Sequence, residues 1–104
     1  MINKTQLRAI SGDAPDLILE ILADFHTEQL GNWKNTSILS TDEIKSRAHQ
    51  LAGSSGSLGL DSLSTAAREV ESTPENSSLA EAILPLLEQS VQEAKSTLES
   101  WINP

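Results

Sequence analysis

Hydrophobic residues recur along most of this chain at spacings of three and four, the repeat of one face of an α-helix. The ranges predicted as helix are 4–10, 14–30, 40–58, 61–71 and 78–101. Runs that alternate between apolar and polar β-branched residues, which are typical of strands, are missing from the sequence. Long helices with short links predict one all-α domain over residues 1–104, an antiparallel up-down four-helix bundle with a short extra N-terminal helix.

The helix ends carry recognisable capping residues. The predicted caps are Asp13 for the second range, Ser40 with Glu43 for the third, Gly59 after it, Asp61 for the fourth, and Ser78 with Glu81 for the last. Pro85 should kink the last helix or force it to restart, because proline removes one backbone hydrogen bond. The apolar stripe expected on the second helix comprises Leu17, Ile18, Ile21, Leu22 and Phe25.

The third predicted helix carries a histidine opposite its apolar stripe. That stripe comprises Ile44, Ala48, Leu51, Ser55 and Leu58. At about 100° per residue His49 lies on the other side and points to solvent. The residues expected beside it on this outer face are Lys45, Ala52, Gly53 and Gly56. Each glycine inside a helix sacrifices about 0.8–1 kcal/mol relative to alanine, so this face is expected to be cleared for the approach of another protein.

An exposed imidazole is a good acceptor for a phosphoryl group, since it is largely neutral and nucleophilic near pH 7. The sequence supports a hydrolase site or a metal site less well. Ser54 and Ser55 lie nearby, but mid-helix backbone amides offer no oxyanion hole for a serine hydrolase. No metal site is predicted, because neither His49 nor His26 has a glutamate three residues before it and cysteine is absent. His26 is interpreted as a boundary residue without chemistry.

Charge and hydropathy exclude several classes of partner. The formal net charge is −8, from 15 acidic and 7 basic residues, which disfavours nucleic acids and anionic membranes. No stretch approaches the roughly 18 apolar residues of a membrane helix, and the N-terminus lacks the apolar run of a secretory signal. We therefore expect a cytoplasmic protein, and a monomer, because one bundle consumes the apolar stripes.

Residues 48–71, AHQLAGSSGSLGLDSLSTAAREVE, resemble the histidine-containing phosphotransfer (HPt) domain of bacterial multistep phosphorelays. The matching positions are His49, Leu51, Gly53, Ser54, Ser55, Gly59, Leu63 and Glu71. Residues 11–30 also look like the opening helix of that family, so the resemblance covers nearly the whole chain. It implies that His49 accepts a phosphoryl group from the aspartyl phosphate of one receiver domain and passes it to the aspartate of another.

The same resemblance implies which proteins this chain binds and which activities it lacks. Receiver domains of response regulators and hybrid histidine kinases would be the partners, and they would bring the magnesium ion, so this chain needs no cofactor. It would have no kinase or hydrolase activity of its own. The alternative is an interaction module of the same fold that binds or inhibits a receiver or a kinase without carrying phosphate. The sequence favours neither a free-standing protein nor the end of a hybrid kinase.

One position departs from the family pattern. Members usually have lysine or arginine three residues after the histidine, and this chain has Ala52. Lys45, one turn before His49, is predicted to supply the missing positive charge, with Gln50 and Gly53 also close to the phosphate. Ala52, Gly56 and Arg68 are predicted to contact the partner, together with the second helix around Leu30.

Overall fold

The computed structural model describes residues 2–73 and 75–104, and within them it contains helices and no strand. The all-helical prediction is therefore confirmed. The helices are α1 (Lys4–Ser11), α2 (Pro15–Trp33), the 3-10 turn η1 (Thr36–Ile38), α3 (Thr41–Ser57), α4 (Asp61–Ser72), α5 (Ser77–Glu81) and α6 (Ile83–Ile102). None of the described helices is both long and apolar enough to cross a membrane.

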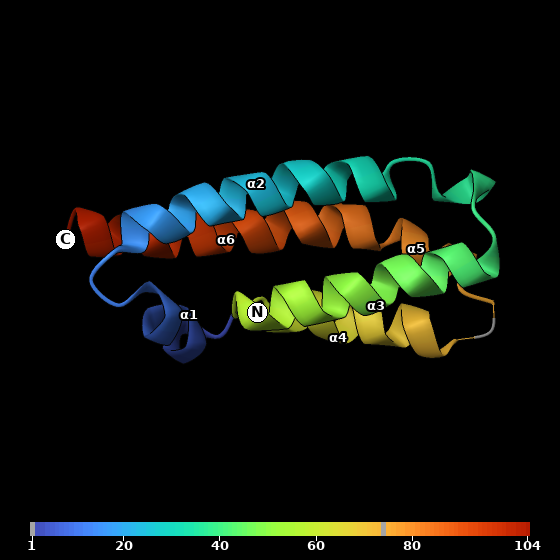
Figure 1. The fold of residues 1–104 in the computed structure, drawn as a ribbon, viewed down its shortest axis with the longest axis horizontal. Coiled ribbons are helices and arrows are strands. Elements are labelled where there is room, and N and C mark those ends of the chain that lie inside the picture. Colours follow the sequence, from blue (N-terminus) through green and yellow to red (C-terminus); the bar gives the residue numbers. More distant parts are fainter. Residues whose placement is uncertain (1, 74) are drawn as a thin grey trace.

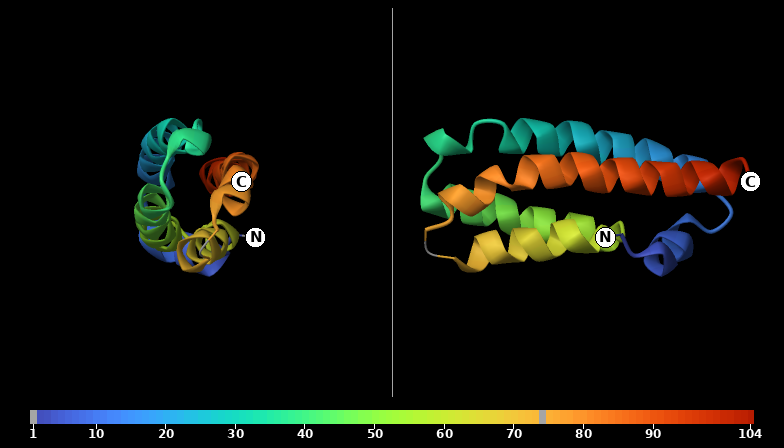
Figure 2. Two further views of the ribbon diagram at one scale, coloured as in Figure 1. Left: turned by 90° about the vertical axis from the view of Figure 1, so that its right-hand side faces the viewer. Right: turned by 180° about the vertical axis from the view of Figure 1, so that it is seen from behind.

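The long helices lie along one axis of an elongated molecule of 44 × 21 × 16 Å (Figure 1). The chain runs one way along α2 and α4 and the opposite way along α3 and α6. In the end-on view of Figure 2 these four helices surround a common centre. The pairs α3–α4 and α2–α6 make the most extensive contacts, and α1 lies beyond the end of the α3–α4 pair.

The centre of the bundle is filled by aliphatic side chains from every long helix. The largest fully buried ones are Leu7, Ile44, Leu51, Leu60, Leu63, Ile83, Leu87, Leu98 and Val70. Such a core anchors each helix by one face, since burial of an aliphatic side chain contributes about 1.5–3 kcal/mol. The opposite face of each helix is largely left to solvent.

The apolar stripe predicted for α2 is narrower than expected. Ile18, Leu22 and Phe25 are buried, but Leu17 and Ile21 are 53% and 45% exposed, so their assignment to the core is wrong. The buried face continues instead through Gln29 and Trp33. These buried positions are three or four residues apart, so they form a single stripe along one face of α2.

The predicted caps of α3 are confirmed. The Ser40 hydroxyl accepts a hydrogen bond from the Glu43 amide at 3.2 Å, which is the capping bond of a capping box, and donates to the Glu43 carboxylate at 3.1 Å. At the other end, Gly59 follows the C-cap Leu58 with φ +75°, a conformation that favours glycine. A β-carbon there would lie 2.8 Å from the Asn3 carbonyl oxygen, so Gly59 also lets the chain before α1 pack against the α3–α4 turn.

Three other cap predictions are wrong. The N-cap of α2 is Ala14, the N-cap of α4 is Leu60, and neither makes a side-chain capping bond, so Asp13 and Asp61 do not cap. α5 begins at Ser77, which leaves Ser78 inside it. In each case the cap predicted from the sequence lies one residue or two from the observed boundary, and tertiary packing moves such boundaries easily.

The restart predicted at Pro85 is confirmed. α5 ends at Glu81, and α6 begins at Ile83, so Pro85 lies in the first turn of α6. The amides of a first turn have no partner within their own helix, so proline is tolerated there.

Candidate functional site

His49 lies on α3 where the helical repeat places it, on the face away from the core. The predicted inner stripe is confirmed, since Ile44, Ala48, Leu51, Ser55 and Leu58 are all buried. The His49 side chain is 76% exposed. The hydrophobic contacts of the stripe thus fix the helix while the imidazole remains open to a partner.

A carboxylate from the neighbouring helix holds the imidazole. The Nδ1 atom of His49 lies 2.6 Å from Oε2 of Glu71 on α4, whose side chain is 37% exposed. A carboxylate only accepts hydrogen bonds, so Nδ1 carries the proton. The neutral ring then has its lone pair on Nε2, and no hydrogen bond to Nε2 is present among the described residues. In the neutral ring, the pair therefore presents the Nε2 lone pair to solvent in a fixed orientation.

Two shallow hollows meet at His49. In one, the imidazole is accompanied by Lys45, Gln50 and Glu71. In the other it is accompanied by Gln50 and Gly53 of α3 and by Glu28 of α2. The structure therefore brings together His49, Lys45, Gln50 and Gly53, the residues that the sequence singles out around the phosphate.

The glycines on α3 differ in what surrounds them. A β-carbon on Gly53 would meet no atom within 4 Å, so this position is open, as predicted. A β-carbon on Gly56 would lie 3.4 Å from the Ser64 hydroxyl of α4. Gly56 is half-buried and allows α3 and α4 to pack closely, so it is not simply part of a cleared outer face.

The placement of Ala52 on the exposed face is wrong. Ala52 is only 5% exposed, and its carbonyl oxygen accepts a hydrogen bond of 2.8 Å from Ser64. α3 contacts both the core and α4, so its buried surface is wider than the apolar stripe alone indicates. Arg68, in contrast, is exposed on α4 and shares a groove with Gly53 and Gly56. That Ala52, Gly56 and Arg68 contact a partner stays a prediction.

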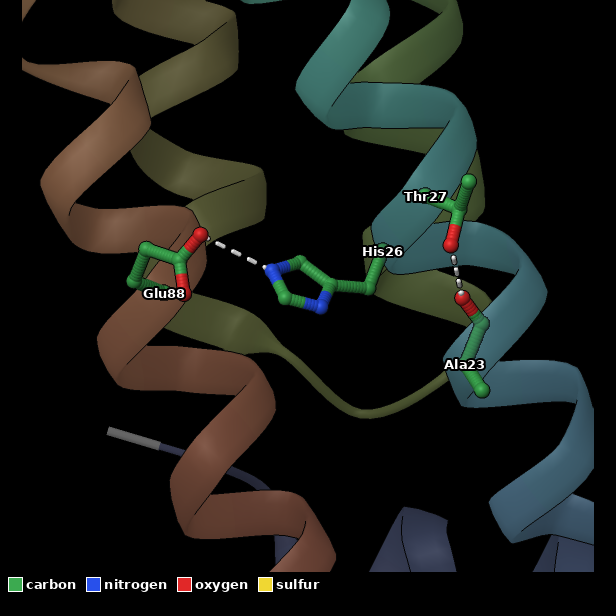
Figure 3. Close-up of polar contacts among 4 residues, drawn as sticks. All are labelled: Ala23, His26, Thr27 and Glu88. Carbon is green, nitrogen blue, oxygen red and sulfur yellow. Dashed lines mark hydrogen bonds and ion pairs between the residues drawn. The ribbon is translucent and has the colours of Figure 1, made fainter.

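The other histidine ties two helices together. His26 of α2 is half-buried, and its Nε2 lies 2.9 Å from Oε1 of Glu88 on α6 (Figure 3). This contact therefore links α2 with α6, which pack side by side. Within the ranges 2–73 and 75–104 no three His, Asp or Glu side chains are grouped so that they could hold a metal ion.

Glu71 contacts His49, yet no role at the site was predicted for it from the sequence. It is one of the positions that carry the family resemblance, yet it lies 22 residues from His49. The contact between Glu71 and His49 could have been found from the register of the helical hairpin that α3 and α4 form. In an antiparallel pair, facing residues have the same sum of residue numbers, and Gly56 with Ser64 has the same sum as His49 with Glu71.

The comparisons with known proteins agree with this geometry. The family model described as Hpt domain matches residues 7–97, a range that contains α2, α3 and α4 entirely. No significant match was found among curated proteins or among solved structures.

Proposed function

This chain belongs to the Hpt domain family, and on that premise we propose that it carries a phosphoryl group on His49 between two receiver domains. The observation that supports this most directly is the exposed imidazole with Nδ1 held by Glu71 and Nε2 open. The proposal takes α2, α3, α4 and α6 as the four-helix bundle that presents this histidine, and it places the protein in the cytoplasm as a monomer.

The transfer step follows from the hydrogen bond. The Nε2 lone pair attacks the phosphorus atom of the receiver's aspartyl phosphate, an N–P bond forms, and the acyl P–O bond breaks. The aspartate leaves as a carboxylate, and the proton on Nδ1 stays where it is. The ring becomes positively charged, and the Glu71 carboxylate, 2.6 Å away, stabilises that charge. Attack by the aspartate of a second receiver on the same phosphorus reverses the step.

Glu71 also acts before the transfer, by orientation. The hydrogen bond to Nδ1 fixes the ring and its tautomer, as carboxylates do for catalytic and metal-bound histidines. In-line attack requires the lone pair to be aimed at the phosphorus, and a held ring reaches that geometry without losing further rotational freedom. α3 and α4 together therefore form the functional unit.

Lys45 is the residue that we propose for the positive charge beside the phosphate. It lies in the same hollow as His49 and Glu71, one helical turn before the histidine. Gln50 lines that hollow as well and offers a donor to a phosphoryl oxygen. No magnesium ion is assigned to this chain, and we propose that the receiver supplies the ion and the acidic pocket that holds it.

A transfer assay tests the proposal. A receiver domain is phosphorylated with acetyl phosphate and magnesium, purified and mixed with this protein. The expected product is an acid-labile, alkali-stable phosphate on the wild type that is absent from His49→Gln. The matched control is His26→Gln, which removes the other histidine and should accept phosphate normally. Phosphate that still reaches His49→Gln, or a wild type that binds receivers and takes none, would refute the proposal.

The role of Lys45 has its own measurement. We expect Lys45→Ala to shorten the lifetime of phosphohistidine in the isolated protein by several fold, because one charge is then lost beside the phosphate. The protein is loaded with phosphoramidate, which reacts with histidine directly and needs no partner. An unchanged lifetime would show that Lys45 does not contact the phosphate.

A further inference from the structure

A groove runs between α3 and α4 beside the histidine. Its α3 wall includes Gly53 and Gly56, and its α4 wall includes Asp61, Thr65 and Arg68. His49 is not part of its lining. The groove is nevertheless continuous with the site, because Gly53 lines both this groove and a hollow that contains the imidazole.

The two ends of the groove carry opposite charges. Arg68 and Asp61 are both exposed, and neither makes an ion pair with another described residue. They are seven positions apart on α4, so they lie on nearly the same face, about 10 Å apart along the axis. The register that pairs His49 with Glu71 places Arg68 across from Ala52, one turn from the histidine. The positive end of the groove is therefore the end nearer to the imidazole.

Arg68 differs from Arg8 and Arg47, the other two arginines of this acidic chain, which both contact groups within it. Arg8 stacks on the ring of Trp101 at 4.8 Å, and Arg47 donates to the Asn32 carbonyl oxygen. Lys45 lies in the hollow of His49, whereas Arg68 lines only the adjoining groove. An exposed guanidinium that lines a groove together with Gly53 and Gly56 is well suited to bind a carboxylate of a protein that enters the groove.

We propose that the α3–α4 groove is a polar docking surface that orients the receiver domain over His49. A carboxylate of the receiver binds Arg68, and a cation of the receiver lies against Asp61. Because the two ends differ in sign, only one of the two directions along the groove is favourable, and this selects a single orientation of the partner. The proposal rests on the proposed function and assigns Arg68 to the partner, not to the phosphoryl group.

Charge reversal separates this role from the chemistry of the histidine. At low salt and subsaturating receiver, Arg68→Glu should slow transfer from the phosphorylated receiver roughly tenfold, and the deficit should shrink at 1 M salt, where screening acts within about 3 Å. Arg68→Gln should give a smaller loss. Loading by phosphoramidate and the lifetime of phosphohistidine should match the wild type in both variants, and thermal unfolding shows that each is folded.

The matched control is Lys95→Glu, which changes the net charge equally but lies on α6, where it lines a pocket with His26. It should transfer at the wild-type rate. An equal slowing in this control would refute the groove as the cause, since overall repulsion would then explain the loss. A shortened phosphohistidine lifetime in isolated Arg68→Glu would also refute the proposal, because Arg68 would then contact the phosphate.

The proposed function and this inference fail differently. If the wild type accepts no phosphate from any receiver, the carrier role is wrong. If the wild type accepts phosphate and Arg68→Glu accepts it equally fast at low salt, the carrier role stands and the docking groove is refuted.

Discussion

Gly53 provides the sharpest test of the link between helix stability and access to the histidine. It lies in the interior of α3, is exposed, and has no atom within 4 Å of the position that a β-carbon would take. Its backbone has no positive φ. Nothing in the fold therefore requires glycine there, and we expect Gly53→Ala to stabilise the protein.

The size of the effect follows from the same facts. No contact is lost and no neighbour must move, so the change is the helix propensity of alanine over glycine, about 0.8–1 kcal/mol. For a domain of about 100 residues this raises Tm by roughly 4–8 °C. Gly53→Gln should also stabilise the helix, by somewhat less, but its longer side chain extends into the hollows that Gly53 shares with His49 and with Arg68.

Transfer should therefore decline as stability rises. We expect Gly53→Gln to slow phosphoryl transfer from a receiver by about tenfold or more, since a displacement near 1 Å in a transfer geometry can cost about a hundredfold. Loading by phosphoramidate, a small donor, should change little. Stability is measured by urea unfolding with tryptophan fluorescence, because Trp33 is 3% exposed in the fold and becomes solvated on unfolding.

Gly31→Ala is the matched control. Gly31 is an exposed glycine in α2 whose β-carbon would also meet nothing within 4 Å, and it lines neither hollow that contains His49. It should gain about the same stability, and because its methyl group is small, its transfer rate should fall far less than that of Gly53→Gln. The reasoning is refuted if Gly53→Ala destabilises the fold, or if Gly53→Gln transfers as fast as the wild type.

Substitutions at three further positions test the scaffold by urea unfolding. Gly59→Ala should destabilise by about 2 kcal/mol or more, because left-handed backbone alone costs alanine about 1–2 kcal/mol and the methyl group meets the Asn3 carbonyl at 2.8 Å; an unchanged midpoint would contradict this. Ser40→Ala should cost about 1 kcal/mol through loss of the α3 cap, and Ser40→Asp should restore it. Ser64→Ala should lose about 1 kcal/mol with its buried hydrogen bond to the Ala52 carbonyl oxygen, and an equal urea midpoint would refute this.

Periodicity alone located the histidine and its face. The buried residues of α3 match the predicted stripe, because a helix with a clear apolar repeat has only one way to face the core. Ala52 was misplaced because a helical repeat describes one buried face, whereas α3 also packs against α4. Close helix contact there depends on Gly56 and Ser64, and small or polar residues give no hydrophobic signal.

The pairing of His49 with Glu71 could not be obtained from either helix alone. It depends on the register between α3 and α4, which the tight turn at Gly59 fixes. The predicted starts of α2 and α4 were wrong for a related reason. Asp13 and Asp61 are good caps by residue type, but α2 and α4 begin after Ala14 and Leu60, and helix boundaries of this kind shift by one or two residues with tertiary context.

The single open Nε2 of His49 has a consequence for the order in which partners can bind. In the proposed relay, one nitrogen on one face serves every receiver, so a donor and an acceptor exclude each other and must bind in turn. The overall transfer rate then depends on how quickly each receiver dissociates, and tight binding of either receiver would halt the relay. An excess of unphosphorylated donor should therefore inhibit delivery to the acceptor by simple competition, although it takes no part in that second reaction.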